Sequence, residues 1–266
     1  MAEMISKAKL KNLRALTRTK ERDQAGVYLA EGLRLVRDAI TLGANLEMLV
    51  FDKECFEESE KLRELSKAGD VLAFLAEPSD FKEISDTVKS QGVIAVVAKS
   101  DSSPRQEFSQ AHATFLVLDN MRDPGNVGTL IRHAAAFDCS GIFMLKGCAD
   151  PYNVKAVRAS MGGIFTVPIE VGCDIVDVVE LLMENRVWTY VADRSSDANP
   201  ALAIDYAPKS AFVIGGETEG LQPYWGEQNA IKIAIAQTER IDSLNAAVAA
   251  AILLSHRYHR EQAGSS

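Results

Sequence analysis

The chain has 266 residues, of which 47% are hydrophobic and 25% are charged, a balance typical of a soluble globular protein with room for two ordinary domains. No apolar run approaches the roughly 18 residues of a membrane span, and the first residues lack the apolar core of a signal peptide. The net charge of −8 argues against a protein that coats nucleic acid indiscriminately.

The first segment is basic, unlike the rest of the chain. Residues 4–20 have a helical pattern, and residues 1–22 carry seven cations against two carboxylates. A basic patch on an acidic body suits selective docking on a phosphate backbone, although a solvated helix face would give the same pattern. The cations predicted to contact nucleic acid are Lys7, Lys9, Lys11, Arg14 and Arg18.

Strands and helices then alternate up to about residue 100. The apolar patterns predict strands at 27–32, 47–51, 71–75 and 92–98, and helical segments at 33–42, 56–67 and from 78 onward. This alternation predicts a small α/β domain over residues 1–100. Residues 101–110 are polar and contain a proline, which makes them the best candidate for a linker.

Residues 111–266 are predicted to form a second α/β domain. Its expected strands and helices are strands 114–118, 140–145, 187–192, 211–215 and 231–235, and helices 126–137, 152–160, 174–185 and 243–260.

The four cysteines, Cys55, Cys139, Cys148 and Cys173, show no Cys-x-x-Cys spacing. We therefore expect free thiols in a reducing cytoplasm. No clustered ligand set of the zinc or magnesium kind is apparent, so no metal site and no membrane association are expected.

Three stretches of the second domain place polar residues or glycines where a strand ends. Residues 115–132 read as a strand, a turn rich in Asn, Pro and Gly, and a helix that contains Arg132. Residues 212–221 read as a buried strand that ends in Gly215 and Gly216, where the backbone can approach a ligand closely. Residues 231–235 alternate like a strand, and Asp242 or Ser243 is expected to cap the last helix. A plain dinucleotide-binding fold is disfavoured, because the first of these strands is not followed by Gly-x-Gly-x-x-Gly.

In this order the three stretches resemble the SpoU/TrmH family of RNA ribose 2′-O-methyltransferases, of the SPOUT class. The resemblance rests on three matching sets, namely Asn126, Gly128 and Arg132; Gly215, Glu217, Gly220 and Leu221; and Ile235, Ser243, Leu244 and Asn245. Residues 151–168 also look like the family's middle segment. Two sites depart from the family pattern: Thr218 stands where Gly is usual, and Ala236-Gln237 where Pro-Met is usual.

The resemblance implies a mostly parallel sheet with a deep trefoil knot, preceded by a domain similar to the ribosomal protein L30e fold that holds RNA. It implies S-adenosyl-L-methionine as the cofactor, bound largely by backbone at Gly215, Gly216, Leu221, Ile235 and Leu244. It also implies a homodimer formed through the knotted domain.

The catalytic candidates are Arg132, Asn126, Glu217, Ser243 and Asn245. A free guanidinium is a poor base, but Arg132 beside an RNA phosphate could orient the ribose, and the resemblance implies that it helps to remove the 2′-hydroxyl proton. Asn126 could instead be only a turn residue, and Ser243 only a helix cap. Asparagine is unfavourable inside a helix unless its side chain has a hydrogen-bond partner, and Asn245 is expected near the start of the last helix. This favours a functional contact for Asn245.

The expected function is cofactor-dependent 2′-O-methylation of a ribose in RNA, with 23S ribosomal RNA as the expected substrate. The alternatives are a transfer-RNA ribose methyltransferase, a non-catalytic RNA-binding protein of the same fold, and a base-methylating enzyme of the SPOUT class. The sequence does not select the nucleotide, because RNA targets are chosen by shape and a few base contacts.

Overall fold

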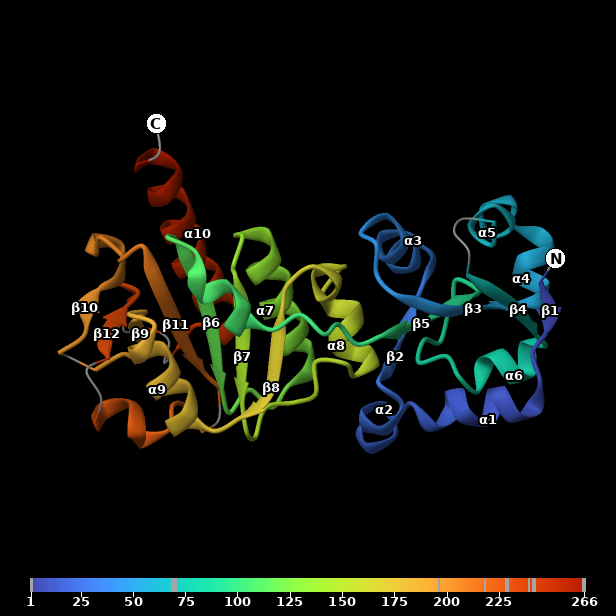
Figure 1. Ribbon diagram of the computed structural model, residues 1–266, viewed down its shortest axis with the longest axis horizontal. Helices are drawn as coiled ribbons and strands as arrows, with labels where there is room; N and C mark the ends of the chain where they lie inside the picture. Colours follow the sequence, from blue (N-terminus) through green and yellow to red (C-terminus); the bar gives the residue numbers. More distant parts are fainter. Residues whose placement is uncertain are drawn as a thin grey trace. The chain divides into compact units, whose positions relative to one another are not determined.

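The computed structural model describes residues 2–67, 71–195, 197–217, 219–227, 230–238, 240 and 243–264. By its internal contacts the chain divides into two compact units: residues 1–101 with 150–166, and residues 102–149 with 167–266. The sequence division at residues 100 and 111 differs from this one in two respects: residues 150–166 join the first unit (Figure 1), and residues 102–110, expected to be a linker, belong to the second unit.

The first unit is built on a mixed five-stranded sheet with the order β1-β4-β3-β5-β2. Its strands are β1 (Glu3–Met4), β2 (Val27–Glu31), β3 (Leu46–Asp52), β4 (Leu72–Ala76) and β5 (Val93–Ala98). Its helices are α1 (Lys7–Ala15), α2 (Thr19–Ala25), α3 (Leu33–Thr41), α4 (Lys53–Glu58), α5 (Glu60–Leu65), α6 (Pro78–Lys82) and α8 (Val154–Ala159), with the 3-10 helix η2 (Gly163–Phe165).

The helix expected over residues 4–20 is shorter than its pattern suggests. Glu3 and Met4 pair with β4 instead, and Ser6 caps α1 by accepting a hydrogen bond from the backbone nitrogen of Lys9 at 3.3 Å. Leu10 and Leu13 of α1 then pack with Phe81 of α6 in the core on one side of the sheet. The apolar spacing was therefore read correctly, but the cap sets where the helix begins.

A buried ion pair ties residues 150–166 to the first unit. Arg22, which is 1% exposed, donates from Nε to Oδ2 of Asp150 at 3.1 Å and from Nη1 to the Leu16 carbonyl at 2.6 Å. The ring of Tyr152 lies 4.9 Å from that of Tyr28, measured between centroids. Breaking a buried ion pair leaves an uncompensated charge, so this contact is expected to be costly to lose.

The second unit contains a seven-stranded sheet with the order β10-β12-β9-β11-β6-β7-β8, and all its pairings between described residues are parallel. Its strands are β6 (Ala113–Asp119), β7 (Gly141–Leu145), β8 (Ile169–Cys173), β9 (Trp188–Ala192), β10 (Asn199–Pro200), β11 (Lys209–Gly215) and β12 (Ile231–Ala234). Its helices are α7 (Pro124–Ala136), α9 (Ile175–Glu184), α10 (Ala246–Gly264) and the 3-10 helices η1 (Pro104–Ser109), η3 (Ala201–Ala203) and η4 (Pro223–Glu227). The predicted α/β class and mostly parallel sheet are confirmed.

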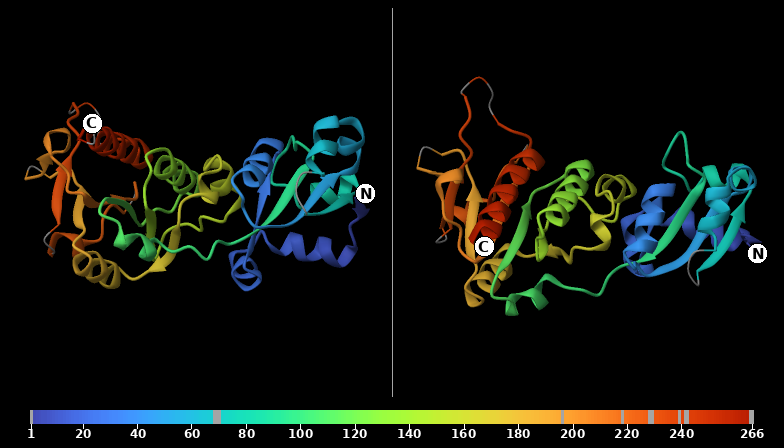
Figure 2. Two further views of the ribbon diagram at one scale, coloured as in Figure 1. Left: turned by 45° about the horizontal axis from the view of Figure 1, so that its top comes forward. Right: turned by 90° about the horizontal axis from the view of Figure 1, so that it is seen from above.

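Helices cover both faces of this sheet, which is the usual arrangement for parallel strands that are buried on both sides (Figure 2). Helices α7 and α10 lie together on one face, and α9 and η1 lie on the other. The stretch expected to be a linker contributes Phe108 of η1 to the core, where its ring centroid lies 4.8 Å from that of Phe115. Among the described residues no helix is long and apolar enough to cross a membrane.

Candidate active site

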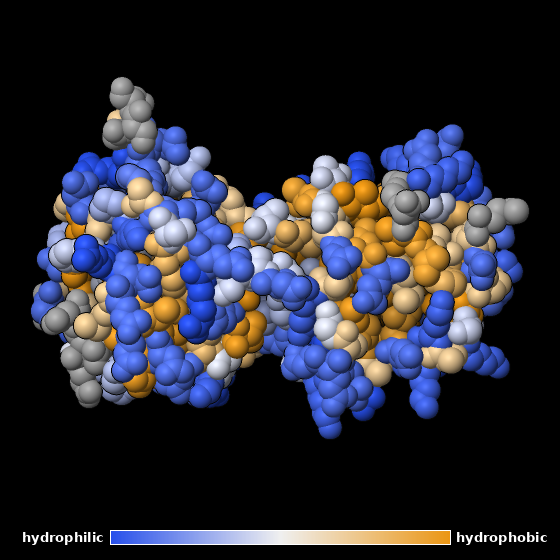
Figure 3. Space-filling model, in the orientation of Figure 1, coloured by the Kyte–Doolittle hydropathy of each residue, from blue (hydrophilic) through white to orange (hydrophobic). Residues whose placement is uncertain are grey.

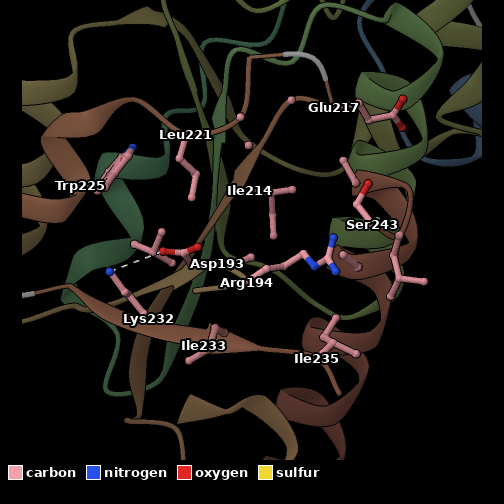
Figure 4. Close-up of a pocket in the computed structure, with 18 of the residues that line it drawn as sticks. Asp193, Arg194, Ile214, Glu217, Leu221, Trp225, Lys232, Ile233, Ile235 and Ser243 are labelled. Atoms are coloured by element: carbon pink, nitrogen blue, oxygen red, sulfur yellow. Dashed lines mark ion pairs between the residues drawn. The ribbon is translucent and has the colours of Figure 1, made fainter. Parts of the chain in front are cut away.

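The carboxyl ends of β9, β11 and β12 surround a pocket in the second unit, as expected for an open parallel sheet. The pocket has a volume of about 550 Å³, within the roughly 300–1,000 Å³ usual for small-ligand sites. Its lining includes all five residues proposed for the cofactor: Gly215, Gly216, Leu221, Ile235 and Leu244. Glu217 and Ser243 line it as well (Figure 4).

Two glycines shape the floor of this pocket. A Cβ on Gly216 would lie 2.2 Å from the carbonyl oxygen of Asn120, and a Cβ on Gly215 would lie 2.8 Å from the backbone of Gly220. The backbone nitrogen of Gly216 donates to the Asp119 carbonyl at 2.8 Å, and that of Gly220 donates to Gly216 at 3.0 Å. The chain therefore folds back on itself where only glycine fits, and its backbone faces the pocket.

Asp119, which the sequence reasoning missed, anchors the other side of this loop. It is fully buried at the end of β6. Its Oδ2 accepts from the backbone nitrogen of Gln222 at 2.7 Å and from Nε1 of Trp225 at 3.0 Å, and its Oδ1 accepts from Nε2 of Gln222 at 2.8 Å. The sequence did hold a signal for this role, namely a carboxylate at the end of an otherwise apolar strand. A charge buried there needs several hydrogen-bond donors.

Side chains from all three sequence motifs meet beside the pocket. The amide nitrogen of Asn126 donates to Oε1 of Glu217 at 3.1 Å, and the amide nitrogen of Asn245 donates to the same oxygen at 2.5 Å and to Oδ1 of Asn126 at 3.1 Å. Oδ1 of Asn245 accepts from the backbone nitrogens of Ala247 and Val248 at 3.0 and 3.2 Å. The structure thus brings these three candidates together as one hydrogen-bonded cluster.

The last helix is capped differently from the prediction. Asn245 is its N-cap and not a residue inside the helix, so its side chain serves α10 and the cluster at once. Ser243 lies before the helix, is exposed and lines the pocket. Asp242, the other expected cap, lies outside the described residues, as does Thr218, one of the departures from the family pattern.

Arg132 lies on α7, about one and a half turns beyond Asn126, and its side chain is exposed. It does not line the pocket. The next residue, His133, is a poor candidate for a base because its Nδ1 is buried and no described residue pairs with that atom. Burial lowers the pKa of His133 from its ordinary value, and the charge of Arg132 acts in the same direction.

Asp193 and Arg194, at the end of β9, also line the pocket and were not anticipated. Figure 4 shows Arg194 extending across the pocket toward Ile214 and Ser243. With its amide oxygen turned toward Arg194, Gln237 accepts from Nε and Nη2 at 2.8 and 3.1 Å. This second departure from the family pattern therefore meets an arginine inside the pocket. The rule that ligands bind at the carboxyl ends of parallel strands could have pointed to both residues.

The basic N-terminal segment is less available for RNA than its charge suggests. Lys7, Lys11 and Arg18 are exposed. Arg14, however, pairs with Asp80 and Glu83 at 3.2 and 2.6 Å, Lys9 lies over the ring of Phe74 at 3.8 Å, and Arg22 is the buried partner of Asp150. Among the described residues no group of three or more His, Cys, Asp or Glu side chains could hold a metal ion.

Family models match both parts of the chain. Residues 113–255 match the SpoU rRNA Methylase family, and residues 7–95 match the MRM3-like substrate binding domain. The fold, the pocket and these matches define a methylase domain joined to a substrate-binding domain. The chain belongs to the SpoU rRNA Methylase family.

Individual relatives agree with this assignment. The chain is 31% identical to "rRNA methyltransferase 3A, mitochondrial" of Danio rerio, over 88% of the chain but only 64% of that protein. It is 28% identical to "23S rRNA (guanosine(2553)-2'-O)-methyltransferase RlmP" of Bacillus subtilis, over 96% of the chain and 97% of the relative.

Solved structures show the same fold. An AdoMet-bound rRNA methyltransferase from Sinorhizobium meliloti has a TM-score of 0.83 and 30% identity, covering 97% of both chains. The SpoU methyltransferase AviRb from Streptomyces viridochromogenes, in complex with AdoMet, has a TM-score of 0.87 and 25% identity, covering 97% of this chain and 99% of that one.

Proposed function

We propose that this protein uses S-adenosyl-L-methionine to methylate the 2′-hydroxyl of a ribose in ribosomal RNA, in the large-subunit RNA by analogy with the 23S rRNA enzyme of Bacillus subtilis. The observation that carries the proposal is the cluster of Asn126, Glu217 and Asn245, because it joins three sequence motifs beside a pocket with a backbone floor. A non-catalytic RNA-binding protein would not need this cluster.

The pocket fits the cofactor. Its floor at Gly215 and Gly216 has no space for a Cβ, so a ligand there meets backbone, while Leu221, Ile235 and Leu244 supply apolar surface for an adenine ring. S-adenosyl-L-methionine would be held by these five residues, and it supplies an electrophilic methyl group on a positively charged sulfur. Arg194 and Gln237 add polar groups to the same pocket.

The remaining chemistry falls to the protein and the substrate. With the cofactor bound, a new bond from the ribose 2′-oxygen to the methyl carbon would replace the carbon–sulfur bond, and the hydroxyl proton would pass to a base or to water. The guanidinium of Arg132 is exposed, so it can bind a phosphate of the RNA. In that position it would orient the ribose and assist removal of the hydroxyl proton. Glu217 holds the amides of Asn126 and Asn245, which fixes the start of α10 against α7.

The acceptor atom is the decisive test. Wild-type protein, isotope-labelled cofactor and protein-free ribosomal RNA should give a 2′-O-methyl nucleoside after nuclease digestion and mass spectrometry, with transfer RNA as the control substrate. Deoxyribose at the mapped position removes the nucleophile, so methylation should stop while binding largely persists. A methylated product from the deoxy-substituted RNA would show that the acceptor is a base. Labelling of transfer RNA alone would show that the substrate is transfer RNA and not ribosomal RNA.

We also propose that the chain of the second unit is knotted, as the resemblance to the family implies, and that the protein forms a homodimer through this unit. Two-fold pairing is the commonest symmetry of soluble oligomers, and Val248 of α10 is 47% exposed next to the cluster. The small residues of α10 support the dimer less than expected, since Ala246, Ala247 and Ala250 are buried within the protomer. A monomeric mass by light scattering at micromolar concentration would contradict this proposal.

A further inference from the structure

The first unit contains a second cavity, separate from the pocket of the second unit. It has a volume of about 250 Å³ and lies where β2, α3, α8 and the loop before β5 meet. This is below the roughly 300–1,000 Å³ of a site for a drug-sized ligand, so it suits a single ring system. All its lining residues belong to the first unit.

A buried carboxylate fixes one wall of this cavity. Glu31, 6% exposed, accepts from Oγ of Ser85 at 2.5 Å, from Oγ1 of Thr87 at 2.5 Å and from the backbone nitrogen of Asp86 at 2.9 Å. Its charge is thereby compensated, and the loop at residues 85–87 is held against the end of β2. Thr87 of this loop and Lys89 after it line the cavity, whereas Val88 between them faces the solvent.

Gln91, farther along the same segment before β5, binds the start of α3. Oε1 of Gln91 accepts from the backbone nitrogen of Leu33, at the start of α3, at 2.8 Å. The side-chain amide is thus oriented by its oxygen, and no described residue accepts from its nitrogen. Leu35 and Met161 give the cavity apolar surface, and Met161 is 38% exposed with a left-handed backbone φ of 48°.

Three cations surround the opening. Arg34 is 73% exposed and lies 3.8 Å from Asp38, a loose pair, and Arg158 lies 3.3 Å from Asp86. Lys89 is exposed and has no ion-pair partner among the described residues. Exposed pairs of this kind contribute little to stability, so the cations can exchange carboxylates for phosphates at low cost. Figure 3 shows one face of the first unit, on which hydrophobic residues gather in a patch bordered by hydrophilic ones.

We propose that this cavity binds one unpaired nucleotide of the RNA substrate, with its base against Leu35 and Met161 and its phosphates at Arg34, Lys89 and Arg158. RNA is recognised mainly through unpaired bases that enter pockets, with cations on the backbone and amides on the base edge. The cavity supplies these three elements together. The proposal rests on the proposed function, and it adds a docking point on the first unit that is distinct from the methylated ribose.

A charge-matched pair of variants tests the phosphate contacts in the full chain. Arg34→Ala with Lys89→Ala should weaken binding of the substrate RNA fragment about tenfold and flatten its salt dependence. The control is Arg37→Ala with Lys82→Ala, which removes one exposed arginine from the same helix and one exposed lysine from α6, neither at the cavity. The control should weaken binding less than about threefold, and cofactor affinity should stay unchanged in both. Equal losses in the two variants would overturn the proposal in favour of general electrostatics.

Abasic substitution tests the base contact. Replacing the unpaired nucleotides of the fragment one at a time by abasic sites should reveal a position, away from the methylated ribose, where wild-type protein loses about tenfold in affinity. In Met161→Ala the same substitution should cost much less, because the apolar wall is already lost. If Met161→Ala lost affinity only for ribosomal particles, with its affinity for protein-free RNA unchanged, the proposal would be overturned and the cavity would be a protein-docking site. These measurements need no methyl transfer, so a wild-type protein that binds RNA without methylating it overturns only the proposed function.

Discussion

Arg132→Ala should reduce methyl transfer by about 100- to 10,000-fold while leaving the affinity for S-adenosyl-L-methionine within about twofold. The side chain is exposed on α7 and does not line the pocket, so under the proposed function we expect it to act on the RNA at the reacting hydroxyl and not on the cofactor. Calorimetric titration of the cofactor and single-turnover transfer to RNA would separate the two effects. Arg132→Lys should recover only part of the rate, because an ammonium keeps the charge but not the planar donor fork.

Arg260→Ala is the matched control for this loss. Arg260 is likewise an exposed arginine on a helix of the second unit, where it pairs with Asp205 at 3.0 Å, and it does not line the pocket. Its loss should leave both transfer and cofactor affinity near the wild-type values. If cofactor affinity and rate fell equally in Arg132→Ala, the arginine would belong to the cofactor site.

The core of the second unit could be predicted from the sequence because its strands are continuous apolar runs. Five expected strands correspond to β6, β7, β9, β11 and β12. The edge strand β8 was missed, since only Cys173 of its five residues is buried and no apolar pattern remains to be read. Strand β10 has only two residues, too few for a periodic signal.

Contacts between distant residues account for the rest of the differences. Arg22 looks like one more surface cation until Asp150, 128 positions away, is brought beside it. The cap at Asn245 is similar: its residue type suggested a functional partner, but only the fold shows that one side chain both binds Glu217 and caps the start of α10. Local pattern therefore located the candidate residues, and long-range pairing decided which were buried, paired or exposed.

Gly216→Ala should destabilise the second unit by about 1–3 kcal/mol or more and weaken cofactor binding at least about tenfold. A Cβ at this position would lie 2.2 Å from the carbonyl oxygen and 2.9 Å from the carbonyl carbon of Asn120, and backbone cannot rotate away as a side chain can. The shift would break the hydrogen bond from Gly216 to Asp119 and move the start of the Glu217 loop. Chemical denaturation and calorimetric titration of the cofactor measure the two effects.

Gly172→Ala separates backbone strain from this steric clash. Gly172 has a positive φ of 74° in β8, and a Cβ there would meet nothing within 4 Å. Its substitution should cost roughly 1–2 kcal/mol of stability through the left-handed conformation alone, without changing cofactor affinity.

Gly220→Ala, with φ of 65° and equally open space, should cost a similar amount of stability. It lies in the pocket loop, so its effect on the cofactor should fall between those of the other two variants. Unchanged cofactor affinity in Gly216→Ala, at any stability, would mean that the turn after β11 does not form the cofactor floor.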